Sequence, residues 1–247
     1  MDLRLLNKDD FRLGMLVKLI APYITDKAII LDYGCGNGYI EEFFAQKAKK
    51  IVGLDKDQKL LAFLHKKRNI IFKEYQHLNN LKPKSFAVIL CLDVLEHIQN
   101  DQELLKRFFR LLKKNGKLIL NVPVYQFLYN THDRALGHKR RYETTNFVNL
   151  LQQTGFNVLY HRQWNTWGFF ATLLFGKLIN GKMDFKFRKQ KNLLSYLINK
   201  LLSCFLLGFE AKLKSSPLGI SLFIVANKIS IIPKIKNILL INLFIVM

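Results

Sequence analysis

The stretch Ala28–Tyr39, AIILDYGCGNGY, places three glycines within five residues, directly after an apolar run. The apolar run predicts a buried strand, and the residues after the last glycine predict a helix through about Lys49. Glycine lets the backbone approach a ligand that a Cβ atom would exclude, and free N–H groups at the start of a helix face the same ligand. One acid, Asp32, stands immediately before the turn.

A second carboxylate follows in the right place for a nucleoside. Asp55 ends the next predicted strand, Ile51–Leu54, where an acid can bind both hydroxyls of a ribose. The alternative is a tight strand–helix turn without a ligand, which the independent position of Asp55 disfavours. Tyr39 stands where a dinucleotide fingerprint needs its third glycine, and the charge of Asp32 suits a cation better than a pyrophosphate. S-adenosylmethionine (SAM), which carries a sulfonium and an ammonium group, fits this pattern.

These segments resemble class I SAM-dependent methyltransferases, in particular methyltransferase domains of type 11 and type 23. LDYGCGNG is similar to the family's first motif, FAVILCLDVLEHI to its fourth-strand segment and PLGISLFIVANK to its last strand. The resemblance covers residues 25–160 and returns at the last strand. It implies a Rossmann-like α/β fold with a seven-stranded, mostly parallel sheet whose last strand is antiparallel, plus a helical insertion before that strand.

The resemblance also implies a set of cofactor-binding residues. Many relatives carry an acid after the third strand, where this chain has EYQHL, so Gln76 through its amide oxygen, or Glu74, would contact the adenine. Ala87 also replaces an acid that is frequent in relatives, which we expect to affect packing only. The residues expected to bind SAM are Asp32, Gly34, Cys35, Gly36, Gly38, Asp55, Lys56, Gln76, Leu92, Asp93 and His97.

Short apolar runs alternate with helical patterns, which is typical of a parallel, doubly wound sheet. After a leading helix within residues 1–25, the pattern predicts strands at 28–33, 51–54, 70–72, 86–92, 117–122, 156–160 and 220–228. Asp57 is expected to cap a helix that runs to about Lys67. Asn100 and Glu103 form a predicted capping box for a helix that we expect to stop at Gly116, and a further helix is expected from Thr144 or Thr145 to about 155.

Charge divides the chain into regions. The formal net charge is +21, and residues 161–247 carry 13 Lys and Arg against two acids. A genome whose base composition favours Lys, Ile and Asn codons is a simpler explanation of part of this excess. The predicted division is a SAM-binding core at 1–160, a basic and apolar helical insertion at 161–216, the final core strand at 217–229 and an apolar tail at 230–247.

Two segments are candidates for acceptor chemistry. Asp93, Glu96 and His97 follow the fourth strand at helical spacing, and could hold a divalent metal that activates a hydroxyl. Some ubiquinone-pathway O-methyltransferases look similar here, with acid, acid and His at this spacing. We favour the alternative, in which they form hydrogen bonds around the cofactor, because three side chains on one turn rarely complete a metal site. No metal is therefore expected.

The second segment is VPVYQFLYNTHDRALGHKRRYE, residues 122–143. Its HD-x-x-LGH-x-RRY pattern resembles one in bacterial methyltransferases linked to cell-envelope and lipid-linked substrates. It predicts a lid with a general base and a clamp for an anionic substrate. The alternative is a surface loop whose arginines pair with carboxylates at the sheet end. The candidate catalytic residues are His132, Asp133, His138 and Tyr142, and the substrate-binding candidates are Arg140 and Arg141.

The last third suggests a surface partner. Wide apolar helices flank the basic cluster 182–191, with Trp164 and Trp167 nearby, which favours a helix lying in an anionic membrane surface over a helical cap on the active site. The apolar stretches are too short and interrupted to span a bilayer. Three scattered cysteines and an N-terminus without an apolar run indicate the cytoplasm, with attachment at the inner membrane face.

The sequence therefore predicts a methyltransferase that moves a methyl group from SAM to a hydroxyl of a small or lipid-linked acceptor, such as an envelope or quinone-like molecule. An RNA acceptor ranks second, because the densest basic cluster flanks apolar helices and no base-methylation signature follows the fourth strand. A SAM-binding subunit without catalysis is the third interpretation.

Overall fold

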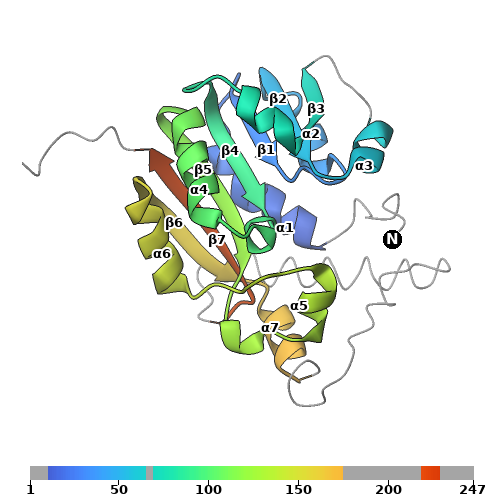
Figure 1. Cartoon of the computed structure of the whole chain (residues 1–247), viewed down its shortest axis with the longest axis vertical. Coiled ribbons are helices and arrows are strands. Elements are labelled where there is room, and N and C mark those ends of the chain that lie inside the picture. Colours follow the sequence, from blue (N-terminus) through green and yellow to red (C-terminus); the bar gives the residue numbers. More distant parts are fainter. Residues whose placement is uncertain (1–10, 65–68, 175–217, 229–247) are drawn as a thin grey trace, which may run out of the picture.

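The computed structural model of the chain describes residues 11–64, 69–174 and 218–228. These residues form one seven-stranded sheet in the order β3-β2-β1-β4-β5-β7-β6 (Figure 1). The strands are β1 (Ile29–Tyr33), β2 (Lys50–Asp55), β3 (Ile70–Glu74), β4 (Phe86–Leu92), β5 (Leu112–Pro123), β6 (Phe156–Trp164) and β7 (Ser221–Lys228). β7 runs antiparallel to both of its neighbours and the first five strands are parallel, which confirms the predicted fold class.

Helices cover both faces of the sheet. The α-helices are α1 (Phe11–Ile20), α2 (Tyr39–Phe44), α3 (Gln58–Phe63), α4 (Asp101–Leu111), α5 (Thr131–Leu136), α6 (Thr144–Gln153) and α7 (Thr166–Ala171). Short 3₁₀ turns are η2 (Ala21–Tyr23), η3 (Tyr75–Asn80), η4 (Leu95–His97) and η5 (Gln126–Leu128). α4 and α6 pack on one face through residues such as Phe108 and Phe147, and α1 and α2 pack on the other through residues such as Ile20 and Phe44.

Local signals place most of these elements. Asp57 caps α3 by accepting a hydrogen bond from Leu60 N at 3.0 Å, and Asn100 caps α4 by accepting from Glu103 N at 3.3 Å, as predicted. Both caps lie at the carboxyl end of the parallel strands. The helices α5 and α7 lie at the same end of the sheet (Figure 1).

Three predicted helix ends were wrong. The helix after the glycines ends at Phe44 rather than near Lys49, and α4 ends at Leu111 rather than at Gly116. In addition, α3 ends at Phe63, followed by an extended Leu64, rather than near Lys67. The ammonium of Lys228 explains the second difference, because it donates to Phe109 O at 2.6 Å and to Leu112 O at 3.1 Å. These contacts satisfy carbonyls that the helix leaves unpaired, so the chain enters β5 at once.

The sixth strand also continues past its predicted end at Tyr160, to Trp164, because β7 pairs with it as far as Ser221. Trp164 is fully buried there, so it does not belong to an exposed membrane-facing surface, whereas 46% of Trp167 is exposed. The described residues contain no helix with the length and apolar character that a membrane crossing requires. The basic cluster 182–191, the apolar stretch 193–209 after it and the tail 230–247 lie outside the described residues, and the apolar stretch before the cluster is described only as far as residue 174.

Candidate active site

The glycine turn joins β1 to α2 at the carboxyl end of the sheet. Gly34 N and Cys35 N donate to Leu54 O at 2.7 and 3.0 Å, which ties the turn to β2. Gly34, Gly36 and Gly38 all have positive φ angles. A Cβ atom on Gly34 would overlap the Val94 side chain, whereas no heavy atom lies within 4 Å of the same position on Gly36. The turn is therefore packed at its first glycine and open for a ligand at its second.

Asp55 holds this turn in place. Its Oδ2 accepts a hydrogen bond from Gly36 N at 2.9 Å, and its Oδ1 accepts one from Asp57 N at 3.0 Å. The carboxylate thus stands directly beside the open glycine, where the sequence placed a ribose ligand. Contact with the ribose itself stays a prediction.

Asp32 and Glu41 form a buried pair of acids beneath the turn. Their side chains are 2% and 1% exposed, and both line a small internal cavity with Ile40 and Phe44. Among the described residues, Asp32 Oδ1 and both Glu41 carboxylate oxygens have no hydrogen-bond partner. Burial, followed by the charge of Asp55, raises the pKa of Asp32 to about 7, and burial and Asp32 raise the pKa of Glu41. Two unpaired acids in an apolar setting require a shared proton or a cation.

The other predicted cofactor residues are spread more widely. Cys35 is buried in the turn, Lys56 is exposed after β2, and Leu92 is half-buried at the end of β4. Gln76 is exposed and lines an open groove of about 510 Å³ beside β3, together with Glu74. This groove does not include the glycine turn or Asp55, so the adenine contact of Gln76 stays a prediction.

Asp93 anchors a hydrogen-bonded chain across the end of the sheet. Its Oδ2 accepts from Arg12 Nη2 at 2.7 Å and its Oδ1 accepts from Asn121 Nδ2 at 2.7 Å. Asn121 Oδ1 in turn accepts from Trp164 Nε1 at 2.8 Å, and the Arg12 guanidinium lies 5.7 Å from the Trp164 ring centroid. Both carboxylate oxygens of Asp93 are therefore occupied by neighbours from α1 and β5.

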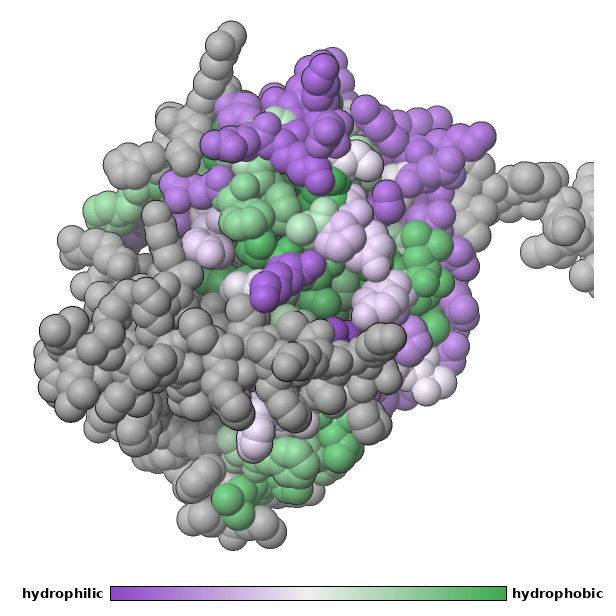
Figure 2. Space-filling model, turned by 180° about the vertical axis from the view of Figure 1, so that it is seen from behind, coloured by the Kyte–Doolittle hydropathy of each residue, from purple (hydrophilic) through white to green (hydrophobic). Residues whose placement is uncertain are grey.

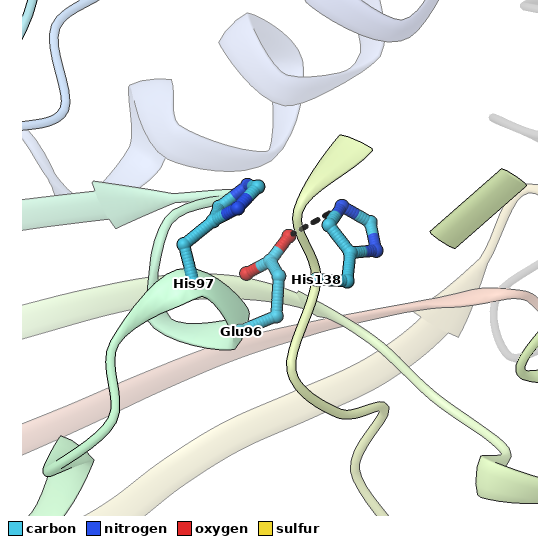
Figure 3. A group of neighbouring side chains, drawn as sticks. All are labelled: Glu96, His97 and His138. Carbon is cyan, nitrogen blue, oxygen red and sulfur yellow. Dashed lines mark ion pairs between the residues drawn. The ribbon is translucent and has the colours of Figure 1, made fainter. Parts of the chain in front are cut away.

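A second cluster joins η4 to the 122–143 segment. The ligand atoms of Glu96, His97 and His138 all lie within 4.8 Å of one another, with His138 Nε2 3.8 Å from Glu96 Oε1 (Figure 3). The rings of His97 and His138 meet edge to face at 4.8 Å between centroids. Lys139 N donates to Glu96 O at 2.8 Å, which fixes the two segments side by side. Glu96 is buried, and burial together with Asp93 raises its pKa.

Asp133 orients His138 from behind. Its Oδ1 lies 2.9 Å from His138 Nδ1, and its two oxygens accept hydrogen bonds from Nε and Nη2 of Arg141 at 3.0 Å. Although burial alone would raise it, the hydrogen bonds from His138 and Arg141 hold the pKa of Asp133 below its usual value. An ionised carboxylate can only accept, so Nδ1 of His138 carries the proton and Nε2 of the neutral ring carries a lone pair.

The remaining predicted residues of the 122–143 segment lie around this pair. Arg140 Nη1 donates to Asp101 Oδ2 at 2.8 Å, and the Tyr142 hydroxyl donates to the same oxygen at 2.9 Å. Burial and the Asp101 charge raise the pKa of Tyr142 well above its usual value, so the hydroxyl keeps its proton. His132 lies in α5 outside the Glu96–His97–His138 cluster. Both arginines are therefore paired with carboxylates, Arg140 with Asp101 and Arg141 with Asp133, and their binding of an anionic substrate stays a prediction.

The structure assembles the polar group after β4 differently from the sequence pattern. Asp93 has a φ of 55° and lies outside η4, so it does not share one helical turn with Glu96 and His97. His138 takes the place beside these two residues that the pattern assigned to Asp93. No short-range signal links His138 to Glu96, because they are distant in the chain.

Sequence reasoning missed four residues that organise the site: Arg12, Glu41, Asn121 and Trp164. One of them carried a usable signal, because Asn121 is a lone amide inside the apolar strand KLILNVP. A fully buried amide needs partners, which here are Asp93 and Trp164. The adjacent pair Glu41 and Glu42 gives no sign of which acid points inward.

Comparison with known proteins identifies the family of the chain. The family described as "Methyltransferase domain" matches residues 8–161. A ubiquinone biosynthesis O-methyltransferase of Pseudomonas fluorescens is 29% identical over 99 residues, which are 37% of this chain and 43% of that protein. A tRNA U34 carboxymethyltransferase of Helicobacter pylori is 35% identical over 137 residues, 51% of either protein. The chain thus spans about half the length of these curated relatives.

A solved structure shows the same fold over more of the chain. The crystal structure of a SAM-dependent methyltransferase from Archaeoglobus fulgidus superposes with a TM-score of 0.58, covering 89% of this chain and 95% of that one at 17% identity. At this identity the likeness establishes the fold alone.

Proposed function

The chain belongs to the methyltransferase domain family of class I SAM-dependent methyltransferases, and from this premise we propose that it methylates a hydroxyl of a small or lipid-linked acceptor. The observation that carries the proposal is the Asp133–His138 pair beside Glu96, which presents a nitrogen lone pair at the carboxyl end of β4. A hydroxyl acceptor must lose its proton as it is methylated, and this cluster is a group able to take it.

The site fits SAM in two respects. The open position at Gly36 leaves space that a side chain would fill, and the buried carboxyl of Asp32 supplies negative charge that favours a cation at the turn. We expect Asp32, Gly34, Cys35, Gly36, Gly38 and Asp55 to hold the cofactor, with Lys56, Gln76, Leu92, Asp93 and His97 around it. When bound, SAM supplies an electrophilic methyl group on its sulfonium.

The chain's own residues supply the acceptor side. His138 is held by Asp133 with Nε2 facing Glu96, so the acceptor hydroxyl is expected to lie beside the Glu96–His97–His138 cluster. The cluster takes up the hydroxyl proton as the oxygen–methyl bond forms, and the demethylated cofactor leaves as the second product. Asp133 is a positioning residue in this scheme, and His132 and Tyr142 remain candidates for contacts with the acceptor.

An apolar acceptor is supported by the surface next to the cluster. Phe127 on η5 and Trp167 and Phe170 on α7 are each about half exposed. Green, apolar surface gathers at the end of the molecule where α5 and α7 lie (Figure 2). Tyr125 connects this surface to the site, because its ring packs against Phe127 and its N–H donates to Tyr142 O at 2.9 Å. Together with the net charge of +21, this surface supports attachment to an anionic membrane as part of the proposal.

A nucleic-acid acceptor is the second candidate, because a tRNA U34 carboxymethyltransferase is among the relatives and the chain is strongly basic. The two candidates are separated by incubating the purified chain with labelled SAM and either a lipid extract or total tRNA. Label in the lipid fraction is the expected result, and label in tRNA alone would reverse the order. Metabolite profiling of a deletion strain would then identify the acceptor through species that lack one methyl group.

The role of the cluster has its own test. We expect His138→Ala to lower methyl transfer by about a hundredfold or more while SAM affinity, measured by calorimetry, stays unchanged. His161→Ala, an exposed histidine on β6, is the matched control and should transfer at the normal rate. Equal loss in both variants, or none in either, contradicts the assignment.

A further inference from the structure

We propose that Glu96, His97 and His138 form a binding site for a divalent transition-metal ion. The ligand atoms of the three residues lie within 4.8 Å of one another, close enough for small adjustments to bring them onto one ion. They come from η4 and from the residue after Gly137, and Figure 3 shows the Glu96 carboxylate between the two imidazoles. The backbone bond from Lys139 N to Glu96 O keeps the two segments together without any metal.

Both imidazoles are prepared as ligands by the groups behind them. Asp133 accepts from Nδ1 of His138 at 2.9 Å, and the carbonyl oxygen of Gly137 lies 3.2 Å from Nδ1 of His97. A carboxylate and a carbonyl can only accept, so each Nδ1 carries the proton and each Nε2 keeps its lone pair. Carboxylate or carbonyl partners of this kind orient metal-bound histidines and fix their tautomer.

The third ligand lacks a partner of its own. Glu96 is 1% exposed, and its Oε2 has no hydrogen-bond partner among the residues that the structure describes. A buried carboxylate without hydrogen bonds is costly, and a bound cation would remove that cost. Asp93 cannot serve in its place, because Arg12 and Asn121 already occupy both of its oxygens.

The donor set limits the metal. Two imidazole nitrogens and one carboxylate oxygen suit zinc, iron(II), cobalt(II) or manganese(II) rather than magnesium or calcium, which prefer oxygen alone. Three protein ligands also leave coordination positions open. In a part of the inference that rests on the proposed function, the acceptor oxygen would occupy one of these positions, where the ion lowers the pKa of the hydroxyl. Its proton would then pass to a water molecule, because Nε2 of His138 is a metal ligand in this state.

Cobalt(II) titration of the full-length chain, after dialysis against a chelator, tests the site by visible absorption and calorimetry. We expect one Co²⁺ per chain, displaced by Zn²⁺, and affinity at least about tenfold lower in Glu96→Gln and His138→Ala. His161→Ala, which also removes one imidazole, is the matched control and should bind Co²⁺ normally. Unchanged affinity in the two ligand variants overturns the proposal.

NMR spectroscopy of the unaltered chain tests the site without a variant that could misfold. Zn²⁺ should shift the ring resonances of His97 and His138 in the unaltered chain and leave those of His77 and His161 in place. A shift of the latter pair alone contradicts the site. If the chelated chain methylates its acceptor but binds no Co²⁺ at these residues, the metal inference fails while the proposed function stands. If Co²⁺ binds at the site but no acceptor is methylated, the metal site stands and the proposed function fails.

Discussion

Buried acids in the two halves of the site, at the glycine turn and in the 122–143 segment, differ in their hydrogen bonds. Beneath the glycine turn, Asp32 and Glu41 are buried with three oxygens unpaired among the described residues. In the 122–143 segment, Asp133 is equally buried but accepts hydrogen bonds from His138, Arg141 and the backbone of Asn130. The first half therefore needs a shared proton or a cation to balance its two acids, whereas the acid of the second half already has its partners within the chain.

The largest expected effect comes from breaking the paired half. Asp133→Ala should lower the free energy of unfolding by about 3–5 kcal/mol, because it leaves the Arg141 guanidinium buried without its carboxylate. Urea unfolding followed by circular dichroism measures the change. Arg107→Ala, which breaks an exposed pair with Glu103 on α4, is the control and should cost less than about 1 kcal/mol. Similar losses of stability in both variants would show that the buried Asp133–Arg141 pair stabilises the chain no more than the exposed pair does.

The glycine turn offers a sharper contrast between packing and binding. Gly34→Ala should cost about 2–4 kcal/mol of stability, since its φ of 91° is unfavourable for alanine and the new methyl group would overlap Val94. Gly36→Ala should cost only about 1–2 kcal/mol, because no atom lies near its Cβ position. SAM binding should instead be weakened most by Gly36→Ala, where the methyl group would fill the open space.

Thermal unfolding and SAM calorimetry on both glycine variants measure these two effects. Val94→Ala should cost less stability in the Gly34→Ala protein, where it relieves the overlap, than in the Gly36→Ala protein, where it only truncates a buried side chain. A Gly36→Ala protein that binds SAM normally would show that the cofactor does not approach this position.

A smaller effect is expected at the acid that fixes the turn. Asp55→Asn keeps the shape of the side chain and removes its charge, and the amide can no longer accept from both Gly36 N and Asp57 N with two carboxylate oxygens. We expect SAM affinity to fall by about 1.5–3 kcal/mol, which is the range for hydrogen bonds to a charged group. Calorimetry measures the affinity, with Asp57→Asn as a control that retains the cap of α3. Equal affinities for the two variants would argue against a ribose contact at Asp55.

The smallest effect is a pH dependence of the unpaired half. The pKa of Asp32 is raised to about 7 by burial and then by Asp55, so the folded chain keeps a proton that the unfolded chain loses near pH 4. Stability from this proton is therefore present at low pH and is lost as pH rises through about 7. A cationic ligand favours the ionised acid, so SAM affinity should rise about tenfold between pH 6 and pH 8.

Glu41→Ala isolates this contribution, because the ligand titrates identically against both proteins. Removing the Glu41 side chain should move the midpoint of the affinity curve to higher pH, since the hydrogen bond from Glu41 lowers the pKa of Asp32. The charged groups that act on the ionisation of Asp32 are Asp55 at the end of β2 and Glu41 on α2, and Asp32 in turn raises the pKa of the buried thiols of Cys35 and Cys91. Identical pH curves for the two proteins would show that Asp32 is not the titrating group.

Sequence patterns predicted the fold and the glycine turn because their signals are local. The alternation of strands and helices, the positive-φ glycines and the caps at Asp57 and Asn100 each depend on residues a few positions apart. The helix ends failed where a distant group intervened, as when Lys228 on β7 capped α4.

The contacts of Glu96, His97 and His138 depend on tertiary structure. Nothing near His138 in the sequence selects Glu96 and His97 as its neighbours, and nothing near Asp93 selects Arg12. These contacts form because long connections bring distant segments back to the same edge of the sheet, where particular charges are buried. Sequence spacing alone therefore does not predict them. By itself the sequence determined a sheet with a glycine turn and two acids at its carboxyl edge. Only the packed chain decided which polar groups are already paired and which are left to bind.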